Sequence, residues 1–190
     1  MTMSEAARPV LDPNEYLADG FRLARKIWED GYRPDFLIGL WRGGAPPGIV
    51  IQEYFRWRGH DPYHTAIRTQ SLEGVMAGGG FDIKGFEHVI SEIEADHKML
   101  LVDNIFDTGR TMYEVTEYLR RRARLNMPEI RVATIYYRPE HRNFLVGPHY
   151  YLHEVDAVPI FPHSLTEMDR GWLRIADPEL AETIWGETGG

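Results

Sequence analysis

The sequence of 190 residues contains no cysteine. Disulfide bonds and thiolate metal sites are therefore excluded, and the absence of cysteine fits a cytosolic protein. No apolar run approaches the roughly 20 residues that a transmembrane helix requires, and the first ten residues lack the apolar core of a signal peptide. We therefore expect a soluble, cytoplasmic protein with no membrane partner.

The sequence also lacks an excess of basic residues, because 21 lysines and arginines stand against 29 acidic residues and give a formal net charge of −8. This charge gives no electrostatic reason to bind nucleic acid, so we expect no nucleic-acid partner. A small anionic substrate would need a local cationic pocket. The Gly-x-x-x-x-Gly-Lys-Ser/Thr pattern of P-loop nucleotidases is absent, which disfavours that class.

What the chain does contain is enough apolar material for a substantial core, since 43% of its residues are hydrophobic and 12% are aromatic. No internal repeat and no Pro/Gly/Ser-rich linker divides it. We expect residues 1–190 to form a single domain.

Helical periodicity and capping residues predict several helices. Asp12 is the expected N-cap of the first, with Pro13 at the first helical position and Glu15 completing a capping box, and the periodic pattern runs up to Gly31. Further helices are expected over residues 46–57, 111–124 and 178–185.

Strands are predicted where short runs are rich in apolar, aromatic or β-branched residues. The expected strands are 36–40, 62–68, 98–103 and 131–137, with two further candidates at 149–155 and 158–161. Between residues 69 and 85 the periodicity fades around three consecutive glycines, which predicts a mobile loop.

The most informative stretch runs from Met99 to Thr111. Leu100 to Val102 are too apolar for a half-exposed strand and suit a buried parallel strand, at whose carboxyl end open α/β sheets bind ligands. The following Asp-Thr-Gly-Arg-Thr turn opens a helix, so its N–H groups and the helix dipole can hold a phosphate. Asp103 and Asp107 would repel a phosphate and instead suit a metal, sugar hydroxyls or a proton transfer.

This string resembles the phosphoribosyl diphosphate (PRPP) binding motif of type I phosphoribosyltransferases: four apolar residues, an acidic pair, two apolar residues and Asp-Thr-Gly-x-Thr. The resemblance implies an α/β fold with a mainly parallel central sheet flanked by helices, a core over about residues 14–140, and a small hood subdomain over about 141–175 plus the N-terminal segment. It assigns the 5′-phosphate of PRPP to Asp107, Thr108, Gly109, Arg110 and Thr111.

The resemblance also places the ribose hydroxyls against Asp103 and Asn104, with Asp103 on the side of a bound metal. Asn104 departs from the usual carboxylate, because an amide can bond a hydroxyl but brings no charge toward a cation.

Leu40-Trp-Arg-Gly-Gly44 resembles the pyrophosphate loop of the family, which assigns pyrophosphate to Arg42, Gly43 and Gly44. Members carry a non-proline cis peptide in this loop, which we expect at Trp41–Arg42. Arg170 is a second candidate for contacting pyrophosphate, and residues 69–85 fall where the family has a loop that closes over PRPP.

The segments that would bind the acceptor base resemble those of purine-using members less closely than the PRPP motif does. Arg138 stands before Pro139 where those relatives carry a lysine that contacts the purine 6-oxygen. Residues 155–164 resemble the hood segment, and its Phe161-Pro162 pair places Val158 where a stacking aromatic is usual. Ile160 and Phe161 either form an apolar wall for the base or belong to the core.

The resemblance implies an enzyme of purine salvage that transfers 5-phosphoribosyl from PRPP to hypoxanthine, guanine or xanthine and releases pyrophosphate. Its implied partners are PRPP and a nucleobase, its cofactor Mg²⁺, and its assembly a homodimer or a higher homo-oligomer. Asp107 would assist removal of the purine proton near N7. Two alternatives remain open: a regulator of the same fold that binds PRPP or a nucleotide without transfer, and a transferase for a different acceptor.

Overall fold

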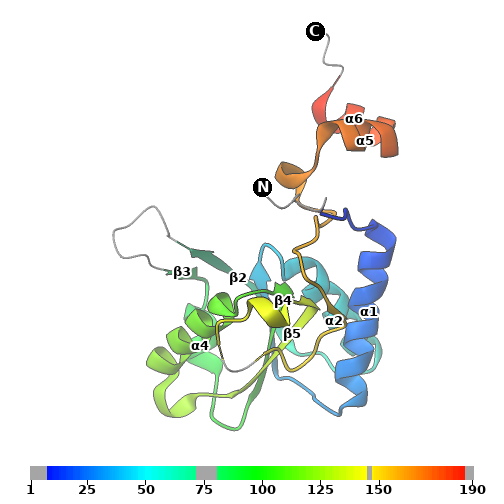
Figure 1. The fold of residues 1–190 in the computed structure, drawn as a ribbon. Helices are drawn as coiled ribbons and strands as arrows, with labels where there is room; N and C mark the ends of the chain where they lie inside the picture. The colour runs from blue at the N-terminus through cyan, green and yellow to red at the C-terminus, as the bar shows by residue number, and fades with distance from the viewer. Residues whose placement is uncertain (1–7, 72–80, 145–146, 187–190) are drawn as a thin grey trace. The chain divides into compact units, whose positions relative to one another are not determined.

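The structure is a computed structural model that describes residues 8–71, 81–144 and 147–186 (Figure 1). The chain divides into two compact units, which we describe separately. The larger comprises Leu17–Val158, and the smaller comprises Met1–Tyr16 with Pro159–Gly190. The division into core and hood expected from the sequence remains a prediction.

The larger unit is built on a six-stranded sheet with the order β3-β2-β1-β4-β5-β6. All neighbouring strands run parallel except β2 and β3, which are antiparallel. The predicted α/β fold with a mainly parallel sheet is confirmed. The strands are β1 (Phe36–Trp41), β2 (Tyr63–Ser71), β3 (Phe81–Lys84), β4 (Lys98–Phe106), β5 (Glu129–Tyr137) and β6 (His153–Glu154).

Helices lie on both faces of this sheet, with α4 on one side and α1 and α2 on the other (Figure 1). At the start of α1, Asp12 accepts hydrogen bonds from the backbone N–H groups of Asn14 and Glu15 at 2.9 and 3.0 Å, which confirms the predicted N-cap. Within the described residues, no helix has the length and apolar character needed to cross a membrane. The α-helices are α1 (Pro13–Glu29), α2 (Ala45–Trp57), α3 (Glu87–Glu92), α4 (Arg110–Ala123), α5 (Arg170–Ala176) and α6 (Pro178–Trp185).

Buried residues of the central strands alternate between the two faces, as the pleat of a strand requires. Ile38 and Leu101 belong to the core cluster beneath α3 and α4, together with Val115 of α4. Leu37 and Leu100, one position away on the same strands, are equally buried but lie outside that cluster. Burial on both faces explains why β1 and β4 read as uninterrupted apolar runs in the sequence.

The prediction of a loop over residues 69–85 is wrong for residues 69–71 and 81–84, which form strands. Strand β2 continues to Ser71, and β3 returns antiparallel to it with Ser71 opposite Phe81 and Arg68 opposite Lys84. Phe81 and Ile83 alternate with polar residues, a weak signal that the glycines before them obscured. Residues 72–80 lie outside the described part of the chain.

The two strand candidates after residue 148 are much shorter than predicted. Only His153–Glu154 forms a strand, while Tyr150 and Ile160 each make a single bridge. Ile160 bonds both Pro9 and Leu11, so the next N–H toward this partner would come from residue 162, and Pro162 has none. Neither α3 nor α5 was predicted, since each spans fewer than two full turns of regular pattern.

An ion-pair cluster joins the C-terminal end of α1 to β5. Arg131 donates from Nη1 to Asp30 Oδ2 at 2.7 Å and from Nε to Glu129 Oε1 at 2.9 Å, and its guanidinium carbon lies 4.3 Å from the centre of the Tyr32 ring. The Tyr150 hydroxyl donates to Asp30 Oδ2 at 2.6 Å. This hydrogen bond from Tyr150, followed by the bond and the charge of Arg131, lowers the pKa of Asp30.

We expect Asp30→Asn to reduce the free energy of unfolding at pH 7 and to have a smaller effect in acid. Because the folded-state pKa of Asp30 lies below its ordinary value of 3.8, its stabilising contribution is complete above that value and is lost as the pH falls through the folded pKa. Urea denaturation of wild type and variant at pH 7 and pH 3 measures this difference. An equal loss at both pH values would contradict the assignment.

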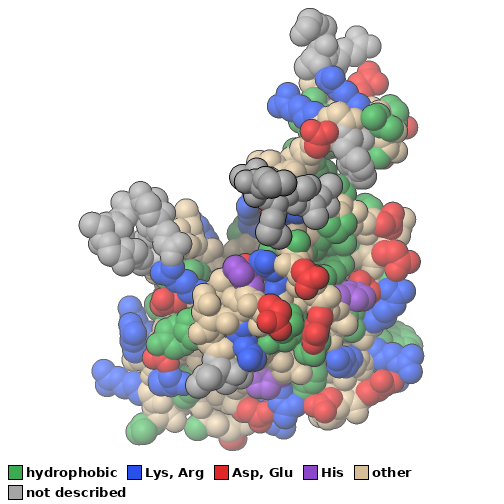
Figure 2. Space-filling view, in the orientation of Figure 1, with side chains coloured by type: hydrophobic (Ala, Val, Ile, Leu, Met, Phe, Trp, Pro, Cys, Tyr) green, Lys and Arg blue, Asp and Glu red, His purple; other side chains and the backbone are tan. Residues whose placement is uncertain are grey.

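Acidic and basic side chains are interspersed on the face shown in Figure 2, in keeping with the modest net charge of −8. A cationic site on this protein therefore depends on individual side chains.

Candidate active site

The carboxyl ends of β1, β4 and β5 lie next to one another, because these three parallel strands are adjacent to each other in the order β1-β4-β5. Three segments therefore leave the sheet at the same edge. They are the loop Trp41–Gly44, the turn Asp107–Thr111 and the segment 138–143. Each contains residues predicted to bind substrate.

The loop after β1 contains the predicted cis peptide bond between Trp41 and Arg42. The N–H of Gly44 donates to the Leu40 carbonyl at 2.7 Å, which folds the loop back on the end of its own strand. A Cβ atom on Gly44 would lie 2.0 Å from the Val102 carbonyl oxygen and 2.5 Å from the Leu40 nitrogen. Only glycine fits at this position.

Gly43 brings the same loop against the pair Asp103 and Asn104 at the end of β4. A Cβ atom on Gly43 would lie 2.3 Å from Asn104 Oδ1 and 2.6 Å from Asp103 Oδ1. The Asn104 N–H donates to Asp103 Oδ1 at 2.8 Å. Burial raises the pKa of the Asp103 carboxyl to about 7, although this hydrogen bond acts in the opposite direction.

The turn between β4 and α4 has the geometry of an anion site. Gly109 has a φ of +84° and immediately precedes α4, and the Arg110 N–H lies 3.3 Å from the Thr108 hydroxyl. A Cβ atom on Gly109 would lie 2.7 Å from the Phe106 ring, so the close approach needs glycine. A hollow of about 220 Å³, lined by Asp103 and residues 105–112, opens at the N-terminus of α4.

Asp107 is held by two basic side chains from the segment after β5. Arg138 Nη1 donates to Asp107 Oδ1 at 2.8 Å, and His141 Nδ1 lies 2.6 Å from the same oxygen. Arg138 also donates from Nε and Nη2 to the Asp156 carbonyl at 3.0 and 2.8 Å. The sequence identified Arg138 and Asp107 but missed His141, whose only signal was its place in a Pro-Glu-His turn after the strand.

The remaining predicted site residues have different surroundings. Val158 is half-buried at the end of the larger unit. Phe161 is buried in the smaller unit, where its ring stacks on His163 at 5.6 Å and meets Tyr16 edge-on at 5.7 Å. Ile160 donates its N–H to the Pro9 carbonyl at 2.9 Å in the same unit. Their contact with a base remains a prediction.

Arg170 begins α5 in the smaller unit, and its guanidinium carbon lies 5.4 Å from the centre of the Trp185 ring. A guanidinium at this distance makes a cation–π contact. The contact between Arg170 and pyrophosphate remains a prediction.

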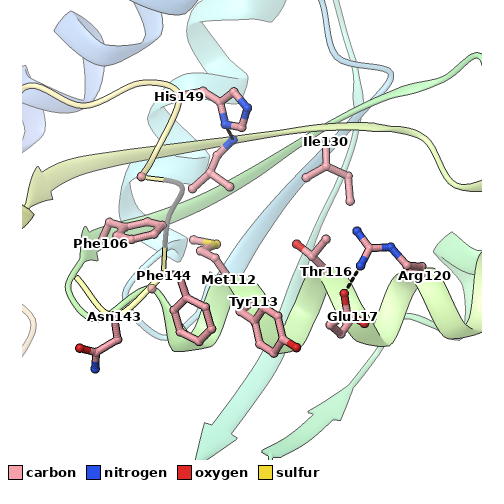
Figure 3. Close-up of a pocket in the computed structure, with 13 residues that line it drawn as sticks. Phe106, Met112, Tyr113, Thr116, Glu117, Arg120, Ile130, Asn143, Phe144 and His149 are labelled. Atoms are coloured by element: carbon pink, nitrogen blue, oxygen red, sulfur yellow. Dashed lines mark hydrogen bonds and ion pairs between the residues drawn. The ribbon is translucent and has the colours of Figure 1, made fainter.

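A second, larger cavity of about 500 Å³ lies beside α4 and β5 (Figure 3). Tyr113 and Phe144 stack in it with ring centres 4.7 Å apart, and Glu117 pairs with Arg120 at its rim. On its other side the Val132 N–H donates to His149 Nδ1 at 3.0 Å. Of the residues predicted to bind substrate, this cavity includes Gly109 alone. It shares Phe106, Gly109 and Met112 with the hollow at the N-terminus of α4, so the two cavities adjoin.

The carboxyl-terminal edge of the sheet thus brings together the loop Trp41–Gly44, the pair Asp103 and Asn104, the turn Asp107–Thr111, and the basic residues Arg138 and His141. A family model for the phosphoribosyl transferase domain matches residues 10–163, which include all of these features. The chain belongs to this family. It is a phosphoribosyltransferase of the type I fold, as the sequence motif implied, and Arg170 lies beyond the matched residues.

Solved structures similar to this phosphoribosyltransferase carry the same fold. A purine phosphoribosyltransferase from Pyrococcus horikoshii is 26% identical, with a TM-score of 0.62 over 81% of this chain and 92% of its own. The xanthine-guanine-hypoxanthine phosphoribosyltransferase of Helicobacter pylori is 14% identical, with a TM-score of 0.62 over 83% of this chain and 94% of its own. A Neisseria gonorrhoeae protein solved with bound ppGpp is 17% identical, with a TM-score of 0.69 over 90% of this chain and 99% of its own.

No curated protein matches the sequence of this phosphoribosyltransferase. Identities of 14% and 17% establish the fold and carry no information about the acceptor.

Proposed function

We propose that this phosphoribosyltransferase transfers the 5-phosphoribosyl group from PRPP to a 6-oxopurine base, and so serves purine salvage. One observation carries the proposal: four features lie together where the parallel strands end. They are the loop Trp41–Gly44, the Asp103–Asn104 pair, the turn Asp107–Thr111, which we call the phosphate turn, and the Arg138–Asp107 ion pair. The 26% identity to a purine phosphoribosyltransferase supports a purine acceptor.

The positions of the hydrogen-bond donors support the proposed PRPP half of the site. Residues 107–111, at the N-terminus of α4, would bind the 5′-phosphate through main-chain N–H groups and the hydroxyls of Thr108 and Thr111. Asp103 and Asn104 would bond the ribose hydroxyls. Arg42 and the backbone of Gly43 would bind pyrophosphate and stabilise the charge that develops on it as it leaves. The Gly44 N–H bonds the Leu40 carbonyl, so Gly44 would contribute by letting the loop pack closely on β4.

The residues at the end of β4 suit Mg²⁺. Among the described residues there is no group of three or more side chains arranged to hold a metal. Asp103 and Asn104 place two side-chain oxygens beside Gly43, and Mg²⁺ is commonly bound by one or two protein oxygens together with substrate phosphates and water. Bound there with PRPP, Mg²⁺ would neutralise negative charge on the leaving pyrophosphate.

On the acceptor side, Arg138 is fixed by the Asp156 carbonyl and by Asp107. A guanidinium fixed in this way can still donate a hydrogen bond to the 6-oxygen of a purine, while the proton on N7 faces Asp107. Asp107 would take the proton that leaves the base. Val158, half-buried at the end of the larger unit, would supply an apolar surface against the ring.

Pyrophosphate release in the presence of PRPP and Mg²⁺ tests this proposal directly. The panel of acceptors is hypoxanthine, guanine, xanthine, adenine, uracil and orotate. We expect release with one or more of the three 6-oxopurines and formation of the matching nucleoside 5′-monophosphate. Release with adenine or a pyrimidine alone would contradict the proposed acceptor while leaving phosphoribosyl transfer in place.

A second candidate is a nucleotide-binding regulator with the same fold. It is favoured by Asn104, which replaces a usual carboxylate, and by the likeness to the N. gonorrhoeae protein with bound ppGpp, which extends over 90% of this chain. Binding of PRPP or ppGpp by calorimetry, together with no pyrophosphate release for any acceptor, would support the regulator and overturn the enzyme.

A further inference from the structure

The segment after β5 is attached to the phosphate turn on both sides of Asp107. The Arg138 N–H donates to the Phe106 carbonyl at 2.9 Å, and the Asn143 N–H donates to the Thr108 carbonyl at 3.0 Å. These two main-chain bonds flank Asp107. Side chains that the segment directs toward the turn therefore converge on the Asp107 carboxylate.

A short 3₁₀ helix, Pro139–His141, determines which side chains of the segment after β5 face Asp107. The His141 N–H donates to the Arg138 carbonyl at 3.2 Å, and residues three apart in a 3₁₀ turn lie on the same side. Pro139 opens the turn because its φ is fixed and it has no N–H to satisfy. Arg138 and His141 thus stand together, with Arg138 Nη1 3.4 Å from His141 Nδ1.

Both side chains bond the same carboxylate oxygen. Asp107 Oδ1 lies 2.8 Å from Arg138 Nη1 and 2.6 Å from His141 Nδ1. An ionised carboxylate only accepts hydrogen bonds, so His141 must carry its hydrogen on Nδ1 in this arrangement. The second oxygen, Oδ2, receives no hydrogen bond from the described residues.

We propose that His141 is a positioning residue for Asp107. Together with Arg138 it holds Oδ1 and turns Oδ2 toward the proton of the acceptor. This inference rests on the proposed function: N9 of the base bonds to ribose C1′, the C1′–O bond breaks with its electron pair leaving on pyrophosphate, and the proton on N7 passes to Asp107. His141 acts only through the carboxylate that it orients.

Substitution at His141 tests this role, with Glu140→Gln in the same turn as the control. Loss of a hydrogen bond to a charged group predicts that His141→Ala lowers kcat about 10-fold while KM for PRPP stays unchanged. His141→Asn keeps an N–H donor and should recover activity to within about 3-fold of wild type. Thermal unfolding of each variant checks that the fold is intact.

A double-mutant cycle with Asp107→Asn separates positioning from a general structural effect. If His141 acts through Asp107, the double variant Asp107→Asn/His141→Ala should be no slower than Asp107→Asn alone. Additive losses, or equal losses for His141→Ala and His141→Asn, would overturn the inference.

The nitrogen resonances of His141 in the ligand-free protein provide a readout that is independent of the acceptor. We expect the Nδ1–H form in wild type and a changed Nδ1 resonance in Asp107→Asn. An unchanged His141 spectrum would overturn the inference whatever the activity. If the spectrum changes but no base in the panel is used, the proposed function fails and the His141–Asp107 bond stands.

Discussion

Replacing Asp107 with asparagine should lower kcat about 100-fold or more, because general acid–base catalysis contributes roughly 10²–10⁴-fold to rate. Asparagine has nearly the same shape and can still accept a hydrogen bond from Arg138, but its amide cannot take up a proton. The measurement is pyrophosphate release at saturating PRPP, Mg²⁺ and an accepted base. KM for PRPP should change much less than kcat, because the main-chain donors of the turn remain.

The matched control is Asp96→Asn, which removes an exposed carboxylate at the opposite end of β4. We expect wild-type kinetics from it. Unchanged turnover of Asp107→Asn with every accepted base would show that Asp107 takes no proton, and would remove the basis for the role of His141.

Replacing Gly44 with alanine should destabilise the protein by about 3 kcal/mol or more and abolish turnover in whatever remains folded. The added Cβ would meet the Val102 carbonyl oxygen at 2.0 Å and the Leu40 nitrogen at 2.5 Å, both backbone atoms of central strands. Neither β1 nor β4 can shift without breaking hydrogen bonds to its neighbouring strands. The loop Trp41–Gly44 must therefore move away from Asp103. Thermal unfolding and pyrophosphate release measure the two effects.

Gly48→Ala is the control for this substitution. Gly48 lies within α2, and its Cβ would meet the Gly39 Cα at 3.6 Å, an ordinary contact. Alanine favours a helix over glycine by about 1 kcal/mol, so stability should be unchanged or raised. A Gly44→Ala variant with the stability and turnover of wild type would refute the tight packing of the loop on β4.

The parts of the fold that could be predicted from the sequence are those with strong local signals. The uninterrupted run Leu100–Val102 predicted a buried parallel strand, and Asp12 with Pro13 predicted the start of α1. The Asp-Thr-Gly-Arg-Thr turn led to the family, and the resemblance in turn led to the cis peptide at Trp41–Arg42. Each of these signals lies within a few consecutive residues.

The features that the sequence did not reveal depend on distant partners. His141 reaches Asp107 across 34 residues, and neither side chain alone indicates the contact. Strand β3 is defined by pairing with β2 at the edge of the sheet, and its four residues have only a weak alternation. Gly43 could be predicted in the loop but not its position against Asp103 and Asn104, because that depends on the packing of β1 beside β4.

A crystal structure of the protein with Mg²⁺ and PRPP tests the central claim most directly. We predict the 5′-phosphate on the N–H groups of residues 107–111, the ribose hydroxyls beside Asp103 and Asn104, and pyrophosphate on the loop Arg42–Gly44. PRPP bound elsewhere, for example in the cavity beside Tyr113 and Phe144, or a phosphate turn left empty at saturating PRPP, would contradict the account.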